Sequence, residues 1–227
     1  PRMPVLDSQS GILFVAQTDE DNGPGTVSMI DARTNTVLTS VKVGISPADP
    51  ALDAARHRLY VPTSTPDLID VIDTQGNKVI AHVKAGRAVD FLVLDAPHRR
   101  LFAVLMNGIT VINTKTNRPT AVIKLPVPVD NGPPALDAAR QRLYVPTASQ
   151  RGYIVIVDTR TNKVKSKIQV EFPKDHEIEI DHVFRGERCR SVRYEIFVQS
   201  IVFDVELNVP GAPAVTFTVS EPVGWFP

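Results

Sequence analysis

Short runs of alternating apolar and polar residues follow one another along the chain, and turn residues separate them. This alternation predicts β-strands, because successive side chains of a strand point to opposite faces. One pattern recurs: a Leu-Asp pair, a tight turn, and a strand of the Arg-Leu-Tyr-Val type. It starts at Leu6, Leu52, Leu94 and Leu136. The starts are 46, 42 and 42 residues apart, and this regularity indicates a repeat protein.

A second landmark recurs in phase with the first. Segments related to I-D-V-I-D-T-Q-G-N-K-V begin at Val27, Ile69, Ile109 and Tyr153. Two landmarks with one period predict units of four short strands, which begin near residues 1, 47, 89 and 131. The first strand of each unit ends at the Leu-Asp pair.

The turn between the third and fourth strands of each unit has a recurring polar chemistry. A side-chain oxygen at its start is expected to accept hydrogen bonds from backbone N–H groups further along the turn. The residues at this position are Asp31, Asp73, Asn113 and Asp158. An asparagine follows where a left-handed conformation is expected, because asparagine tolerates that conformation well. These residues are Asn35, Asn77, Asn117 and Asn162.

The patterns R-L-Y-V, V-I-D-T-x-T-N-x-V and V-K-V-G-x-x-P are similar to the YVTN-type β-propeller repeat of surface and periplasmic proteins. The resemblance covers residues 1 to about 170. It implies an all-β fold of four four-stranded antiparallel propeller-type blades, followed by a C-terminal β segment. It also implies an extracytoplasmic location: periplasmic, cell-surface or secreted. Pro62 and Pro146 depart from the usual repeat, and Pro119 in a fourth strand predicts an edge position or a bulge.

The way in which the repeat array is completed stays open at this point. Many propellers build one blade from both chain ends, but here all units are in phase, so no shared closing blade is evident. Propellers have typically about four to eight blades. The four units can therefore close a small ring, form an open arc, pair with another copy, or belong to a longer propeller.

Residues 171–227 lie beyond the repeat and form the second predicted domain, after 1–170. Strands are expected at Val192–Val198, Ile201–Val209 and Val215–Val219. The stretch FDVELNVPGAPAVTFTVSEPVGWF from Phe203 resembles the late strands of a cupredoxin. That resemblance places the Cys, His and Met copper ligands beyond Pro227, so it implies a cupredoxin that lacks its copper-ligand loop.

The overall charge gives no reason to expect a polyanionic partner. The chain has 25 basic and 25 acidic side chains, whereas nucleic-acid binding depends on an excess of Lys and Arg. No apolar run approaches the roughly 20 residues that a membrane-spanning helix needs. The sequence therefore predicts no nucleic-acid partner and no transmembrane segment. The single cysteine, Cys189, cannot form an internal disulfide.

Two places in the chain offer candidate metal ligands. His176 and His182 flank the run H-E-I-E-I-D-H. In an extended strand they are roughly 20 Å apart, so they share one metal only if the chain folds back. His182 also matches the earlier histidine of a cupredoxin copper site. Asp19 and Asp21 lie in a loop that resembles an acidic calcium site but lacks the ligand spacing of an EF-hand. A solvated strand and a solvated loop are the competing interpretations.

The other recurring polar residues favour structural roles. Asp7, Asp53, Asp95 and Asp137 recur once per unit, which favours a turn role over a ring of carboxylates around an axis. The arginines at the start of the second strands are expected to be exposed: Arg58, Arg100 and Arg142. No spacing indicates a catalytic triad, and the G-x-S-x-G, H-E-x-x-H and C-x-x-C motifs are absent from the sequence.

Three hypotheses about function follow. The first is a non-catalytic extracytoplasmic scaffold for protein–protein binding or assembly, with a protein partner or self-association through blade edges. The second is a propeller–cupredoxin protein associated with redox chemistry or copper. The third is a propeller enzyme of the lactonase or lyase type that uses a divalent cation. The first is favoured, with no catalytic residues and no cofactor assigned, and with copper and calcium as the candidate ions.

Overall fold

The computed structural model of the chain divides into two compact units, Pro1–Val170 and Glu171–Pro227. In the first unit it describes residues 3–18, 23–129, 132–147 and 153–169. In the second unit it describes only the backbone of the strands given below. Among the described residues, no helix has the length and apolar character needed to cross a membrane.

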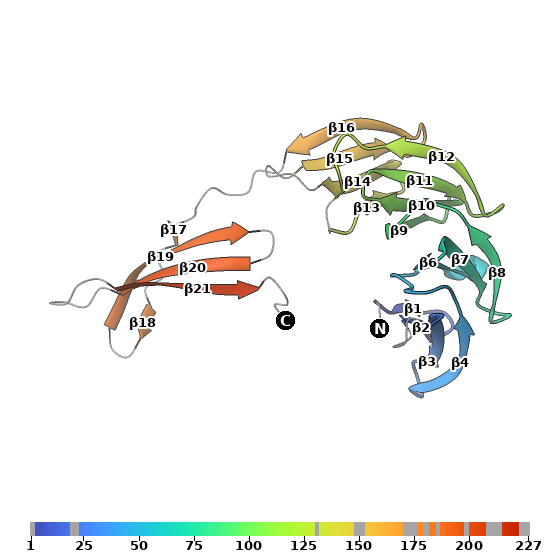
Figure 1. Cartoon of the computed structure of the whole chain (residues 1–227), viewed down its shortest axis with the longest axis horizontal. Helices are drawn as coiled ribbons and strands as arrows, with labels where there is room; N and C mark the ends of the chain where they lie inside the picture. The colour runs from blue at the N-terminus through green and yellow to red at the C-terminus, as the bar shows by residue number, and fades with distance from the viewer. Residues whose placement is uncertain are drawn as a thin grey trace. The chain divides into compact units, whose positions relative to one another are not determined.

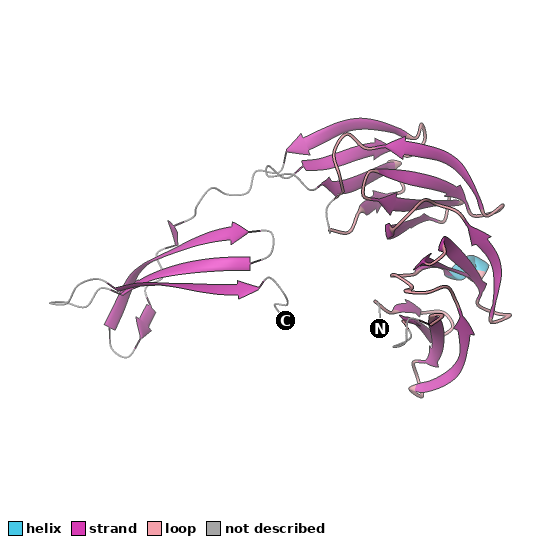
Figure 2. Cartoon of the chain, in the orientation of Figure 1, coloured by secondary structure: helices cyan, strands magenta, loops and turns pink. Residues whose placement is uncertain are grey.

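Four separate antiparallel sheets of four strands make up the first unit, and the strands of each sheet follow chain order (Figures 1 and 2). The first sheet has β1 (Val5–Asp7), β2 (Ile12–Gln17), β3 (Thr26–Asp31) and β4 (Thr36–Lys42). The second has β5 (Ala51–Asp53), a 3-10 turn η1 (Ala54–Arg56), β6 (Arg58–Ser64), β7 (Asp67–Asp73) and β8 (Lys78–Val83). The third has β9 (Val89–Asp95), β10 (Arg100–Leu105), β11 (Gly108–Asn113) and β12 (Arg118–Lys124). The fourth has β13 (Ala135–Asp137), β14 (Arg142–Thr147), β15 (Tyr153–Asp158) and β16 (Lys163–Gln169).

This architecture confirms the predicted fold class, and its physical basis is the burial of both faces of the inner strands. In β6, for example, the adjacent residues Leu59 and Tyr60 point to opposite faces, and both are fully buried. The second and third sheets each pack one face on the sheet before and the other face on the sheet after. The three core clusters accordingly join the first and second, second and third, and third and fourth sheets.

The fourth strand of each sheet is its outer edge (Figure 1). Most side chains of β4, β12 and β16 are exposed. Every sheet has a shift of register between its third and fourth strands, at the same place in the repeat. Pro119 pairs with Ile112 directly after that shift. The predicted edge or bulge position of this proline is therefore confirmed, because a proline there removes no regular ladder hydrogen bond.

The second unit contains one five-stranded sheet in which β19 and β20 are central. Its strands are β17 (Glu177–Ile178), β18 (His182–Phe184), β19 (Glu187–Phe197), β20 (Ser200–Leu207) and β21 (Val215–Pro222). The three predicted strands are present, although β19 begins earlier, β20 ends earlier and β21 ends later than expected. The antiparallel pairing of β20 with β21 involves the cupredoxin-like stretch, but a hairpin of this kind is common to many folds, so that resemblance stays a prediction.

Candidate interaction surfaces

The turns between the third and fourth strands have the predicted geometry in all four sheets. Each accepting side chain receives two backbone N–H groups; Asp31 Oδ1, for example, lies 2.8 Å from Arg33 N and 3.1 Å from Thr34 N. Asn113 makes the same two contacts at 2.9 and 3.1 Å. The four asparagines that follow have left-handed φ values between 52° and 57°. Both sets of recurring residues therefore stabilise the turns: the first by accepting hydrogen bonds, the asparagines by adopting the left-handed conformation.

The recurring aspartates at the Leu-Asp pairs serve the turns between the first and second strands. Asp7 accepts from the backbone N–H of Gln9 at 3.0 Å. Three of the four carboxylates hold a guanidinium or imidazole from their own sheet. Their partners are Arg56 for Asp53, His98 and Arg100 for Asp95, and Arg140 for Asp137. These contacts confirm the predicted structural role, since each carboxylate is engaged within its own turn.

The arginines that begin the second strands are not exposed as expected. The side chains of Arg58, Arg100 and Arg142 are only 18–32% exposed, and each forms an ion pair. Arg58 and Arg142 pair with the cross-strand aspartates of their own sheets, Asp73 and Asp158, at 3.2 and 3.0 Å. The sequence pattern missed these pairs because they depend on cross-strand register, which places the arginine opposite the turn aspartate.

In the third sheet Asn113 replaces that aspartate, and Arg100 has a different partner. Its Nη2 and Nε donate to Asp95 Oδ2 at 2.8 and 3.2 Å. Its Nη1 donates to the backbone carbonyl of Thr159, in the turn of the fourth sheet. Asp95 is fully buried and also contacts His98 Nδ1 at 2.8 Å. Arg100 therefore links the third sheet to the fourth, a polar contact that the sequence pattern did not predict.

The turn carboxylates predict how stability changes with pH. The backbone N–H of Arg33 lowers the pKa of Asp31, and the backbone N–H of Thr161 lowers the pKa of Asp158. A folded-state pKa below the unfolded value means that stability is complete above the unfolded pKa and is lost as pH falls through the folded pKa. We expect the loss to begin below about pH 4, the usual range of an unfolded aspartate.

An asparagine variant tests this dependence, because Asn113 shows that the amide supports the same turn. Replacing Asp31 and Asp158 together by asparagine should leave the turns formed and reduce the loss of stability between pH 5 and pH 3. Urea unfolding at the two pH values measures the change. An identical pH dependence in the variant and the unmodified chain would contradict the assignment.

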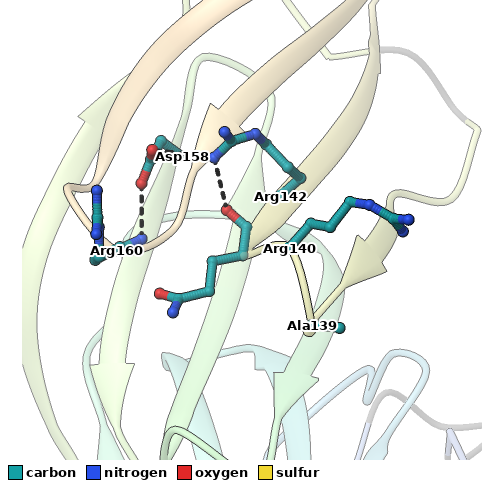
Figure 3. Close-up of a pocket in the computed structure, with 6 residues that line it drawn as sticks. Ala139, Arg140, Arg142, Asp158 and Arg160 are labelled. Atoms are coloured by element: carbon teal, nitrogen blue, oxygen red, sulfur yellow. Dashed lines mark hydrogen bonds and ion pairs between the residues drawn. The ribbon is translucent and has the colours of Figure 1, made fainter.

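The turns of the third and fourth sheets carry an excess of basic residues. Eight arginine and lysine side chains lie in these turns or at their ends, beside three aspartates. A polar pocket of about 240 Å³ in the fourth sheet is lined by Ala139, Arg140, Gln141, Arg142, Asp158 and Arg160 (Figure 3). Figure 3 shows the Arg140 and Arg160 side chains extending in different directions, while Arg142 turns back to the Gln141 carbonyl. The guanidinium groups do not converge, so the pocket is not a built anion site.

A carboxylate and an imidazole lie together on the second sheet, as they do in hydrolytic triads. His82 Nδ1 is 2.7 Å from Asp70 Oδ1, and Gly44 N donates to Asp70 Oδ2 at 2.9 Å. In the third sheet Thr110 has the place of Asp70 and donates to the Ala85 carbonyl at 2.5 Å. The side chain at this repeat position therefore forms a hydrogen bond with the loop that leads into its sheet from the preceding sheet. In the part of the chain with described side chains, no hydroxyl or thiol bonds His82.

An apolar pocket of about 410 Å³ lies beside the turn that joins β10 and β11. Leu105, Met106 and Ile109 line it together with Val122 from the outer strand. Met106 and Val122 are largely exposed. The turn is only two residues long, so it leaves these side chains uncovered.

Among the described residues of the first unit, the first and fourth sheets each have one apolar face that no other of the four sheets covers. We call the uncovered face of the first sheet the leading face; it contains Leu13, Val15 and Ile30, all half-buried. Residues at the same repeat positions in the other sheets are fully buried, with an exposed fraction of 0%. They are Leu59, Leu101 and Leu143; Val61, Ala103 and Val145; and Ile72, Ile112 and Val157.

The uncovered face of the fourth sheet, the trailing face, shows the same contrast. It contains Tyr144, Ile154 and Ile156, which are half-buried, and Ile168, which is 49% exposed. Their counterparts in the other three sheets are no more than 7% exposed. These are Phe14, Tyr60 and Phe102; Val27, Ile69 and Ile109; Met29, Val71 and Val111; and Val41, Val83 and Ile123. The sequence predicted partners at blade edges, whereas the incompletely buried apolar side chains described for these two sheets lie on sheet faces.

The predicted metal ligands remain untested. Asp19, Asp21 and His176 lie outside the described residues. His182 begins β18, and its backbone pairs with Cys189, but its side chain is not among those described. Within the described residues, no group of three or more His, Cys, Asp or Glu side chains is placed to hold a metal ion.

Comparison with known proteins identifies the architecture. No protein-family model and no curated protein matches the chain. Among solved structures, the chain is similar to the β-propeller domain of Cps50 (Swd1) from Myceliophteria thermophila, with a TM-score of 0.61 and 14% identity over 92% of this chain and 66% of that one. The chain has the β-propeller fold.

Two further propeller-type structures support this conclusion. Hydrazine synthase of Kuenenia stuttgartiensis aligns with a TM-score of 0.64 and 17% identity over 97% of this chain and 62% of that chain. A chain of a mitotic checkpoint complex aligns with a TM-score of 0.60 and 13% identity over 97% of this chain and 66% of that chain. The chain thus spans 62–66% of the length of these structures, and the similarity concerns the fold.

Proposed function

We propose that this propeller is a non-catalytic scaffold that binds protein through the leading and trailing faces. The supporting observation is the contrast between equivalent positions. Tyr144 is partly exposed, although Tyr60 and Phe102, at the same repeat position, are fully buried by the next sheet. Apolar side chains that stay partly exposed on a sheet face favour an interaction site, because covering them with protein removes them from water.

The chemistry of the two faces favours a protein partner over a small polar ligand. Their named side chains are uncharged, and most are branched aliphatic residues, which contribute to binding through buried area rather than through hydrogen bonds. Tyr144 adds a large side chain of a type that is enriched at interfaces. The neighbours by fold include a chain from a protein complex, which is consistent with this role.

The recurring polar groups support a scaffold rather than an enzyme. The recurring carboxylates have partners within their own sheets, which are turn amides, arginines and the His98 imidazole. The copper and cation-dependent alternatives depend on Asp19, Asp21, His176 and His182, and they stay predictions. An extracytoplasmic location is part of the proposal and rests on the YVTN-type resemblance of the repeats.

A photo-crosslinking experiment tests the scaffold function. A photoreactive phenylalanine analogue at Tyr144 should form covalent adducts with protein when the full chain is irradiated in the cells that produce it. The same analogue at Val122, which is 69% exposed on the outer strand β12, serves as the matched control. We expect several-fold more adduct from position 144. Absence of adducts there, or equal amounts at both positions, would count against protein binding at the trailing face.

A further inference from the structure

We propose that the turns at one end of the third and fourth sheets form a docking surface for an acidic segment of a partner protein. We call this surface the basic platform. It consists of the turns between first and second strands and between third and fourth strands in these two sheets, with their flanking residues: 95–100, 113–118, 137–142 and 158–163. The inference goes beyond the proposed function, because the platform shares no residue with the leading and trailing faces.

Hydrogen bonds join these turns into one surface. Thr114 N donates to the Arg99 carbonyl at 3.0 Å and so joins the two turns of the third sheet. Thr159 N donates to the Gln141 carbonyl at 3.1 Å and joins the two turns of the fourth sheet. The Arg100 guanidinium, which donates to the Thr159 carbonyl, connects the two sheets. The backbone of the platform is therefore organised before a partner binds, which lowers the entropic cost of binding.

The platform has more cations than its carboxylates can pair with. It contains eight arginines and lysines and three aspartates. Each aspartate already has an arginine partner, and these partners are Arg100, Arg140 and Arg142. The other five cations are exposed and form no ion pair with a carboxylate in the part of the chain whose side chains are described. They are Arg99, Lys115, Arg118, Arg160 and Lys163.

The equivalent turns of the first and second sheets have no such excess. Four arginines and lysines lie there with four aspartates, in residues 7–12, 31–36, 53–58 and 73–78. These turns form with balanced charge, so the fold itself does not require the excess. Part of the difference comes from Asn113, which replaces the aspartate of the other sheets and keeps the same turn hydrogen bonds. Because the whole chain has equal numbers of basic and acidic side chains, the excess is a local property of the platform.

The chemistry of the platform favours an acidic protein segment over other polyanions. Guanidinium and ammonium groups bind carboxylates through charge-assisted hydrogen bonds. The four turns contain no Phe, Tyr or Trp, the residues on which proteins stack the bases of single-stranded nucleic acids. They also contain no bulky apolar side chain for insertion into a membrane interface. Figure 3 shows the Arg140 and Arg160 side chains extending in different directions, an arrangement that suits a flexible chain with several carboxylates.

Binding of a labelled glutamate peptide to the full chain tests the inference. A flexible peptide of about ten glutamates should bind at low ionic strength, with fluorescence anisotropy as the readout. Replacing Lys115 and Arg160 together by glutamine should weaken binding about 10-fold, because the change removes two of the five unpaired cations. The turn tolerates glutamine, since Gln75 has the same repeat position in the second sheet and donates its backbone N–H to Asp73 Oδ1.

The matched control removes two cations from the balanced turns. Arg33 has the repeat position of Lys115 and Arg160, and Lys78 ends the equivalent turn of the second sheet. Replacing Arg33 and Lys78 by glutamine should change the affinity by no more than about two-fold. Circular dichroism establishes that each variant is folded. A peptide that does not bind the unmodified chain, or that loses as much affinity in the control, would overturn the platform as the binding surface.

Two other polyanions test the choice of partner. Duplex DNA and vesicles that contain phosphatidylserine should bind the full chain more weakly than the glutamate peptide. Binding of either that is as tight or tighter would overturn the acidic protein segment as occupant. The outcome for the proposed function is separable, because glutamine at positions 115 and 160 leaves the trailing face intact. Crosslinks from position 144 should therefore be unchanged in that variant, whatever the peptide does.

Discussion

Phe102→Ala is expected to lower the free energy of unfolding by about 3–5 kcal/mol, the usual cost of removing a buried aromatic side chain. Phe102 is fully buried in the cluster that joins the third and fourth sheets. Its ring also lies 5.7 Å from the Arg100 guanidinium, which is itself part of the polar link between these sheets. The substitution leaves a cavity at an interface whose two sides are held by separate sheets, so neither side can easily fill it.

Urea unfolding of the full chain measures this effect. Val122→Ala is the control, because Val122 is 69% exposed, and surface substitutions usually change stability by less than about 0.5 kcal/mol. A Phe102→Ala variant as stable as the control would contradict the assignment of the inter-sheet clusters as the source of stability.

Asp95→Ala is expected to destabilise the protein by about 3–5 kcal/mol, the usual cost of breaking a buried ion pair by removing one partner. Asp95 is fully buried, and the Arg100 side chain is only 18% exposed. Without the carboxylate, the guanidinium keeps its contact with Thr159 but loses its counter-charge in a poorly hydrated site. The His98 imidazole loses its partner as well.

Two comparisons make this prediction specific. Asp137→Ala removes the equivalent carboxylate of the fourth sheet, whose partner Arg140 is 80% exposed, so the expected loss of stability is much smaller. Asn113→Asp in the Asp95→Ala background returns a carboxylate opposite Arg100, as in the second and fourth sheets. It should recover a measurable part of the stability. No recovery, with equal losses for Asp95→Ala and Asp137→Ala, would show that the buried ion pair is not the cause.

The features predicted correctly from the sequence depend on interactions between residues close in the chain. Strand positions follow from two-residue alternation, and the turns follow from Asp or Asn side chains that bind amides two and three residues later. The left-handed asparagines follow for the same reason, since their conformation is set by the turn itself. These local rules apply equally to all four units, which is why the repeat made the four-sheet architecture predictable.

The features that differed from expectation depend on residues brought together across strands or between sheets. Arg100 looks identical to Arg58 and Arg142 in the repeat, yet a single change to Asn113 on the facing strand directs it to Asp95 and to the next sheet. Likewise, Tyr144 has the same local sequence as Tyr60, but among the described residues only Tyr60 is covered by a neighbouring sheet. Local sequence thus determines the strands, turns and apolar positions, because these require only neighbouring residues. Burial and ion pairing were decided by the tertiary structure, because the free energy of a side chain depends on what lies against it in space.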